Sequence, residues 1–452
     1  MNANQVEFID VTVRDGQQSL WGATAVTTGM IESIAPILDK AGFKAVDLTT
    51  GTHMAVSVIF HRENPWHKMR VLCQAMPNTP LSFGTSGQRF MTFKLTPDSV
   101  IELMIEKVAD TGIRRFWLTD PSNNMAVLGK TARLAKKAGI EEVVISLVYT
   151  VSPVHTDEYY AQKAREAAMS PDVDGIYVKD PTGLLAPERA RTLIPAIAGS
   201  IHGLPLEIHS HCTLGLAPIC YVEAAKLGVK VFHTAVPPLA NGTSLPSIKN
   251  VVKNLRWLGY SVNLDEEALA KIESYFTNIA ERENRPTGIP QEYDVSVFDH
   301  HVPGGMATTL KRQLSELKME HRFQEVLEEI IRIRMELGYP IMVTPFSQFV
   351  GTQATMNVIS GERYKTAPTE IIQYAAGWFG DPPAPIDQNV LDKISSLPAA
   401  KGIFGKVMPQ PSIKELRQQI GVGPKVSDEE FLLRYALPAS KVDEMLTACN
   451  KD

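Results

Sequence analysis

Short apolar segments rich in β-branched residues alternate with amphipathic segments from the start of the chain to about residue 258. Eight such β-like segments occur in order: Val6–Val13, Ala45–Thr49, Leu81–Thr85, Arg115–Thr119, Val143–Thr150, Gly175–Lys179, Leu206–His211 and Val231–Val236. Each is followed by a segment with helical periodicity, such as Ile31–Lys40 or Pro187–Ala198. Regular strand–helix alternation is typical of parallel βαβ units. Eight units in this length favour a closed (β/α)8 TIM barrel, of class α/β, over an open sheet.

The periodicity changes after the eighth unit. Asp265–Glu281 and Lys311–Gly338 are long helical patterns with little strand signal, and His301–Met306 (HVPGGM) predicts a loop between them. The chain has 452 residues, more than a barrel of ~250 residues needs. We therefore expect a barrel domain over residues 1–300 and a mainly helical domain over residues 301–452.

Composition excludes several classes of protein. The net charge of −5 comes without a basic stripe, so we expect no nucleic-acid partner. No apolar run approaches the ~18 residues of a membrane span, so we expect no direct membrane insertion. The four cysteines lie far apart and form no CxxC pair, and the first residues do not form a secretory signal. These features predict a reduced, cytoplasmic protein.

Four side chains able to bind a metal stand at the predicted carboxyl ends of strands, where (β/α)8 barrels carry their chemistry. They are Asp15, Lys179, His209 and His211. His209 and His211 are two residues apart in a strand, so both imidazoles lie on one face. Two imidazoles and a carboxylate suit a divalent metal, with zinc, cobalt and manganese all admissible.

Lys179 is the unusual member of this set, because an ammonium would repel a metal cation. Burial and a nearby cation both lower the pKa of a lysine. The neutral amine can add CO2 to form a carbamate, whose oxygens bind metals well. Taken singly, the two histidines could serve packing, Lys179 could be a solvated charge and Asp15 could cap a helix. Their joint occurrence at three strand ends favours the metal site.

Five motifs closely resemble the biotin-dependent carboxyltransferase family, which includes pyruvate carboxylase, the oxaloacetate decarboxylase alpha subunit and the pyruvate-side subunit of transcarboxylase. They are Asp10–Leu20 (DVTVRDGQQSL), Tyr149–Thr156 (YTVSPVHT), Lys179–Leu185 (KDPTGLL), Val302–Met306 (VPGGM) and Val343–Ala354 (VTPFSQFVGTQA). The resemblance extends over about residues 8 to 375 and therefore includes both expected domains.

The resemblance implies a role for each matching residue. The metal ligands would be Asp15, carbamylated Lys179, His209 and His211. Arg14 and Lys179 would act in catalysis beside the metal, and Gln18 would contact the substrate. Thr344 would carry a proton between the biotin nitrogen and the substrate carbon while carboxybiotin gives up CO2.

The predicted substrate wall departs from the family pattern. Ser86 stands where the family has an arginine that binds the substrate carboxylate, and Phe93 replaces a tyrosine. Serine cannot replace a bidentate arginine–carboxylate pair. We therefore expect an acceptor other than pyruvate or oxaloacetate, contacted by Ser86, Thr85 and His53. The alternative is that Arg89 occupies the vacant position and that the specificity is ordinary.

The chain carries no AMKM-like hairpin with a biotinylated lysine. We therefore expect biotin to be supplied in trans by a biotin carrier protein, together with biotin carboxylase or decarboxylase partner subunits. We also expect a homodimer or a higher homo-oligomer.

Two other functions remain as alternatives. One is a metal-dependent aldolase or lyase of the related barrel superfamily, which needs neither a carbamate on Lys179 nor Thr344. The other is a non-catalytic assembly paralogue, which has no reason to keep four metal ligands.

Overall fold

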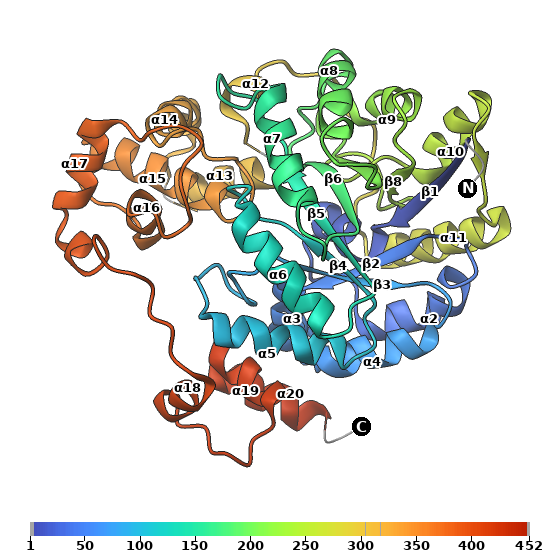
Figure 1. Ribbon diagram of the computed structural model, residues 1–452, viewed down its shortest axis with the longest axis horizontal. Coiled ribbons are helices and arrows are strands. Elements are labelled where there is room, and N and C mark those ends of the chain that lie inside the picture. The colour runs from blue at the N-terminus through green and yellow to red at the C-terminus, as the bar shows by residue number, and fades with distance from the viewer. Residues whose placement is uncertain (1–3, 303, 317, 450–452) are drawn as a thin grey trace.

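The computed structural model describes residues 4–302, 304–316 and 318–449 (Figure 1). Its centre is a barrel of eight parallel strands. The strands are β1 (Gln5–Asp10), β2 (Ala45–Thr50), β3 (Leu81–Thr85), β4 (Arg115–Leu118), β5 (Glu142–Val148), β6 (Gly175–Asp180), β7 (Leu206–Ser210) and β8 (Val231–Thr234). β1 pairs in parallel with both β8 and β2, which closes the sheet. The predicted (β/α)8 TIM barrel is thereby confirmed. A short β9 (Ser261–Val262) extends the pairing at β1.

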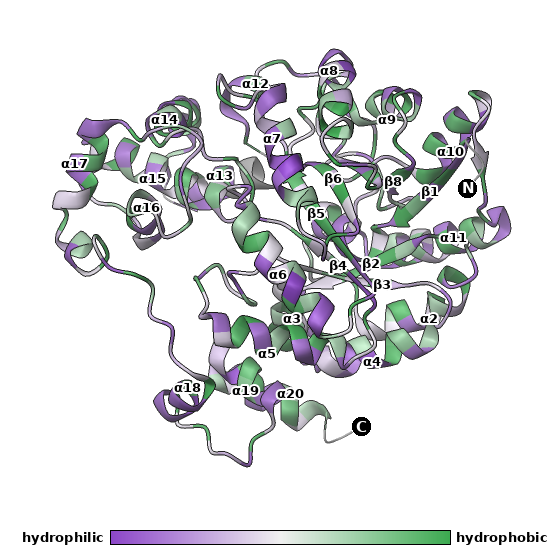
Figure 2. Ribbon diagram, in the orientation of Figure 1, coloured by the Kyte–Doolittle hydropathy of each residue, from purple (hydrophilic) through white to green (hydrophobic). Residues whose placement is uncertain are grey.

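Helices follow the strands: the longer ones cover the outer face of the barrel, whereas short helical segments after β1 and β2 lie at its mouth. In chain order the helices are η1 (Thr12–Gly16), α1 (Gln17–Trp21), α2 (Thr28–Leu38), α3 (Gly51–Val56), η2 (Ser57–His61), α4 (Pro65–Ala75), α5 (Asp98–Ala109), α6 (Met125–Lys137), α7 (Asp157–Ala168), α8 (Pro187–Ala198), α9 (Ala217–Lys226), α10 (Ile248–Trp257) and α11 (Glu266–Arg282). Figure 2 shows β1, β5 and β6 as largely hydrophobic, whereas the outer helices alternate hydrophobic and hydrophilic residues. This pattern follows from burial on both faces of the strands and on one face of each helix.

The register of neighbouring strands determines which side chains meet at the mouth of the barrel. Lys179 on β6 is the pairing partner of His209 on β7. Partners in adjacent parallel strands point to the same face at the same height. Lys179 and His209 therefore reach the carboxyl end of the barrel side by side.

β1 ends earlier than the predicted segment Val6–Val13. The carboxylate of Asp10 accepts hydrogen bonds from the backbone N–H and the hydroxyl of Thr12, at 3.3 and 2.5 Å. These bonds bend the chain away from the sheet, and Thr12–Gly16 forms the helical turn η1. Asp15 therefore lies in a helical turn. β4, β5, β7 and β8 also end one or two residues before their predicted limits.

A second, mainly helical region follows the barrel. Its elements are α12 (Val297–His300), α13 (Gly304–Glu316), η3 (Glu320–Arg322), α14 (Phe323–Glu336), α15 (Phe346–Ser360), α16 (Thr369–Ala375), α17 (Gln388–Ser396) and η4 (Pro398–Gly402). Buried residues between Val302 and Ile403 form a hydrophobic core of their own. The predicted helical C-terminal part is confirmed.

Two local predictions in this region need correction. The pattern at Lys311–Gly338 is divided between α13 and α14, and Lys318 between them has a left-handed backbone, with φ of 59°. Such a residue cannot continue a right-handed helix. The predicted loop His301–Met306 is also shorter, because α13 begins at Gly304. Leu317 and Pro303 lie outside the described residues.

The end of the chain returns to the barrel. Helices α18 (Ile413–Gln419), α19 (Asp428–Ala436) and α20 (Ala439–Cys449) lie beside α4 and α5, away from α13–α17 (Figure 1). Apolar side chains of this tail belong to the barrel's own core, among them the fully buried Phe431. The division at residue 300 stays a prediction. In the described part of the chain, no helix is long and apolar enough to cross a membrane.

Truncating the tail's main anchor tests this packing. Phe431 is 0% exposed, so we expect Phe431→Ala to destabilise the protein by about 3–5 kcal/mol through lost burial and a residual cavity. Val407 is 90% exposed, so Val407→Ala is a control that should leave stability unchanged. The measurement is the urea midpoint of unfolding. Equal midpoints for the two variants would show that the tail does not contribute to the barrel's stability.

Candidate active site at the mouth of the barrel

A cavity of ≈ 530 Å³ lies at the carboxyl ends of the strands, between the barrel and the helical region. Residues of the loops after β1, β2, β3, β4, β6 and β7 form most of its wall, and Val343–Pro345 contributes from the second region. The predicted site residues in its lining are Arg14, Asp15, Gln18, Ser86, Arg89, Lys179, His211 and Thr344. His209 lies just beneath, with 1% of its surface exposed. Thr85 lines the cavity, whereas His53 is buried beside Thr50.

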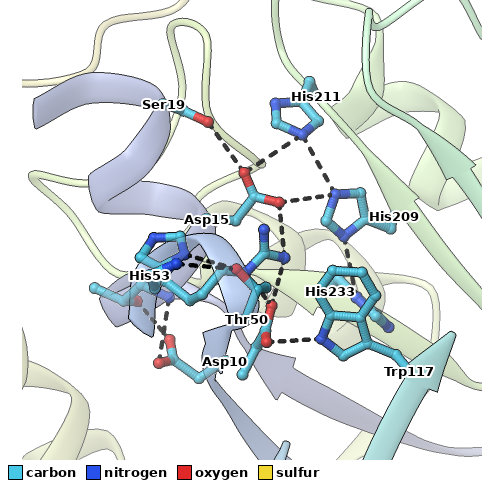
Figure 3. Close-up of polar contacts among 12 residues, drawn as sticks. Asp10, Asp15, Ser19, Thr50, His53, Trp117, His209, His211 and His233 are labelled. Atoms are coloured by element: carbon cyan, nitrogen blue, oxygen red, sulfur yellow. Dashed lines mark hydrogen bonds and ion pairs between the residues drawn. The ribbon is translucent and has the colours of Figure 1, made fainter. Parts of the chain in front are cut away.

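Asp15, His209 and His211 converge on one point. One ligand atom from each lies within 4.8 Å of the others. Asp15 Oδ2 is 3.3 Å from His209 Nε2, and Asp15 Oδ1 is 3.6 Å from His211 Nε2. The two Nε2 atoms are 3.3 Å apart. Figure 3 shows the carboxylate facing both imidazole rings.

A chain of buried polar groups determines which nitrogen of His209 carries the proton. Arg115 Nη2 donates to both carboxylate oxygens of Glu207, at 2.7 and 2.8 Å. Glu207 Oε2 accepts a hydrogen bond from His233 Nε2 at 2.8 Å. In the neutral form of His233 the remaining nitrogen, Nδ1, accepts from His209 Nδ1 at 3.1 Å. The lone pair of His209 Nε2 consequently points at Asp15.

His211 is oriented in the same way by a different acceptor. Its Nδ1 donates to the backbone carbonyl of Thr243 at 2.8 Å, which leaves a lone pair on Nε2. Two lone pairs and a carboxylate thus face one another across less than 4 Å. These three groups repel one another unless a cation lies between them. The donor set fits a divalent metal ion.

The protonation states of the cluster agree with metal binding. Burial opposes ionisation of Asp15, but the charge of Arg14 acts against it, and the pKa of Asp15 lies well below the usual range. Burial also lowers the pKa of His209 well below its ordinary value. An ionised carboxylate beside a neutral imidazole is the form that ligates metals.

Lys179 lies on the face of an aromatic ring in the wall of the cavity. Its Nζ is 4.3 Å from the centroid of Trp117, and the guanidinium of Arg14 is 4.8 Å from the same ring. Asp47 holds this group together, because it accepts from Trp117 Nε1 at 2.8 Å and from Arg14 Nε at 2.6 Å. Burial, reinforced by the charge of Arg14, lowers the pKa of Lys179 to about 8. The neutral amine is therefore a larger share of Lys179 near neutral pH than of an ordinary lysine.

Sequence reasoning missed the residues that orient the site. Glu207 is two residues before His209 on β7 and shares its face, so the alternation that reveals His209 and His211 also points to Glu207. His233 on β8 and Asp47 on β2 carry no local signal, since only the closed barrel brings them to the cluster.

The sequence is similar to carboxylase and carboxyltransferase subunits along almost its whole length. Residues 297–451 match the family model described as "Conserved carboxylase domain". A pyruvate carboxylase subunit of Methanocaldococcus jannaschii is 36% identical over 437 residues, which cover 96% of this chain and 76% of that protein. The methylmalonyl-CoA carboxyltransferase 5S subunit of Propionibacterium freudenreichii subsp. shermanii is 30% identical over 438 residues, covering 96% of this chain and 86% of that subunit.

The fold has a close counterpart among solved structures. The carboxyl transferase domain of Rhizobium etli pyruvate carboxylase, solved with oxamate and biotin, superposes with a TM-score of 0.88. It is 25% identical, and the match covers 99% of this chain and 78% of that one. The similarity therefore includes the barrel, the helical region and the tail.

Replacing His233 tests whether it orients His209. His233→Phe keeps a ring of similar size but removes the acceptor for His209 Nδ1–H, so we expect divalent-metal affinity to fall about 10–100-fold. The measurement is zinc affinity by competition with a chelating dye. His67→Phe changes an exposed histidine on α4 and serves as the control. Wild-type zinc affinity in His233→Phe would contradict this role.

Proposed function

This chain belongs to the family of biotin-dependent carboxyltransferases, and on that premise we propose that its cavity moves a carboxyl group between carboxybiotin and a small acceptor. The observation that carries the proposal is the convergence of Asp15, His209 and His211 at the floor of a cavity that Lys179 and Thr344 also line. The relatives at 30 and 36% identity are carboxylase and carboxyltransferase subunits, which favours this reaction over an aldolase, a lyase or an assembly role.

Asp15, His209, His211 and a carbamate on Lys179 would hold the metal, for which zinc, cobalt and manganese are all suitable. The metal would supply an electrophilic centre that stabilises negative charge developing on the acceptor. The carbamate forms when the neutral Lys179 amine adds to the carbon of CO2 and loses one proton. The depressed pKa of Lys179, at about 8, supports this modification because it increases the share of neutral amine.

The remaining residues would bind the acceptor and move its proton. Arg14 is held rigidly by Asp47 and Asp15, so its charge is fixed beside the reacting centre. Gln18 reaches the same cavity and would bind the substrate. The Thr344 hydroxyl, in the cavity wall contributed by the second region, would carry the proton that leaves the substrate carbon to the biotin nitrogen.

Partner chains complete the proposed enzyme. Biotin would arrive in trans, attached to a biotin carrier protein. The other partner subunit would be a biotin carboxylase or a decarboxylase. The names of both relatives, each a subunit of a larger enzyme, support this arrangement. We propose a cytoplasmic homodimer or higher homo-oligomer, with an acceptor other than pyruvate or oxaloacetate.

Removing the Thr344 hydroxyl tests the proton transfer. We expect Thr344→Ala to lower carboxyl transfer at least about 100-fold while metal content and folding are retained. Thr344→Ser keeps the hydroxyl and should retain most of the activity. The assay follows ¹⁴C from a carboxylated biotin carrier to 2-oxo acids. Near-normal turnover in Thr344→Ala would remove this residue from the mechanism.

Replacing Lys179 tests the carbamate. In ¹³C-bicarbonate, the wild-type protein should give a carbamate carbon signal by NMR, and Lys179→Gln should lose both this signal and tight zinc binding. Lys137→Gln changes a surface lysine paired with Glu102 and should keep both. A carbamate signal that persists in Lys179→Gln, or is missing from the wild type, would contradict the proposal.

A further inference from the structure

The loop after β3 forms one side of the active-site cavity and is held at both of its ends. Arg89 and Leu95 face each other in an antiparallel bridge, and Thr96 N donates to Gln88 O at 2.9 Å. Leu95 packs against the core of the helical region. Gly87 has a positive φ of 70°, and a side chain there would collide with Thr131. Side chains of this loop are therefore presented to the cavity in a defined position.

Arg89 extends from this loop into the cavity without a matching anion. Its Nη1 is buried and has no hydrogen-bond partner. Among the residues that the structure describes, no carboxylate forms an ion pair with it. Asp120 is the carboxylate that acts on its charge. Its Oδ1 accepts from the N–H groups of Ser122 and Asn124, and it forms no ion pair with Arg89 within 4 Å. An unpaired, largely buried guanidinium is costly to a fold, and its planar donors match a carboxylate.

Part of the cavity wall is apolar, although polar side chains such as Ser86 and Thr92 also line it. The cavity is lined by six large hydrophobic side chains: Phe83, Phe90, Met91, Phe93, Met104 and Trp117. Trp117 fits only because position 84 is glycine, since a Cβ there would overlap its indole ring. The cavity of ≈ 530 Å³ lies within the range of about 300–1,000 Å³ that encloses drug-sized ligands. It has room for an acceptor larger than a three-carbon acid beside the biotin ring.

We propose that the acceptor is a carboxylic acid with an apolar body larger than a methyl group. Arg89 binds its carboxylate, and the side chains of Phe90 and Phe93 cover its body. This inference rests on the proposed function for the reaction, but the binding that it describes is independent of carboxyl transfer. Ser86 leaves the space into which the larger body extends.

Comparing the binding of two acids that share the same reacting groups tests whether the acceptor is larger than pyruvate. Pyruvate and phenylpyruvate share the carboxylate, the carbonyl and an acidic C–H, and they differ in the phenyl group. We expect phenylpyruvate to bind the wild-type protein at least about tenfold more tightly than pyruvate, because the phenyl group is removed from water against the aromatic wall. The measurement is isothermal titration calorimetry in the absence of biotin.

Arg89→Met tests the carboxylate contact. We expect it to weaken phenylpyruvate binding roughly 10- to 100-fold and to leave the unfolding midpoint unchanged or higher, because no ion pair is lost. Arg191→Met removes an arginine paired with Glu223 on the outer helices and should bind both acids like the wild type. Phe93→Ala should reduce only the preference for phenylpyruvate.

Three results would overturn the inference: equal binding of the two acids by the wild type, no binding of either, or wild-type binding of phenylpyruvate by Arg89→Met. The pattern expected above, combined with no transfer of ¹⁴C from a carboxylated biotin carrier, would contradict the proposed function alone. Transfer to an acceptor without a carboxylate would leave the function standing and refute the role of Arg89.

Discussion

The buried contact between Arg115 and Glu207 is the interaction on which the orientation of the active site depends. Arg115 overcomes the effect of burial and, with His233, lowers the pKa of Glu207 to about 2. Because Glu207 stays ionised, it can only accept hydrogen bonds, and this determines the tautomers of His233 and then of His209. The direction of the His209 Nε2 lone pair at the barrel mouth therefore depends on Glu207, two side chains deeper in the barrel. Loss of Arg115 would leave the buried Glu207 without its guanidinium partner, whereas loss of Glu207 would leave Arg115 paired with Glu142 alone.

Different strands of the barrel carry the metal-binding residues and the wall that would contact the acceptor. β6 and β7 supply Lys179 and His209, which are register partners, and the segments after β1 and β7 supply Asp15 and His211. β3 and β4 supply the wall, where Gly84 and Trp117 fit each other. A wall built from loops and strand ends can change its chemistry while the metal-binding strands stay as they are.

Much of the fold could be predicted because its signals are local. The alternation of segments defines the barrel, and the rule that chemistry lies at the strand ends selects Asp15, His209 and His211. The features that could not be predicted depend on residues far apart in the sequence, or on side chains whose hydrogen bonds to the backbone end a strand. The end of β1 is determined by a side chain of Asp10 that captures the backbone of Thr12. The amphipathic pattern of the tail predicts helices, but not that Phe431 packs against the barrel.

The return of the tail gives the helical region two attachments to the barrel. At its start, His301 Nδ1 contacts the Thr150 hydroxyl at 3.0 Å, and Arg334 donates to Val151 O at 2.9 Å. At its far end, α18–α20 pack beside α4 and α5 (Figure 1). Both ends of the helical region are thus connected to the barrel, one directly and one through the tail. Thr344 therefore belongs to a segment that is enclosed between two attachments to the barrel whose mouth it lines.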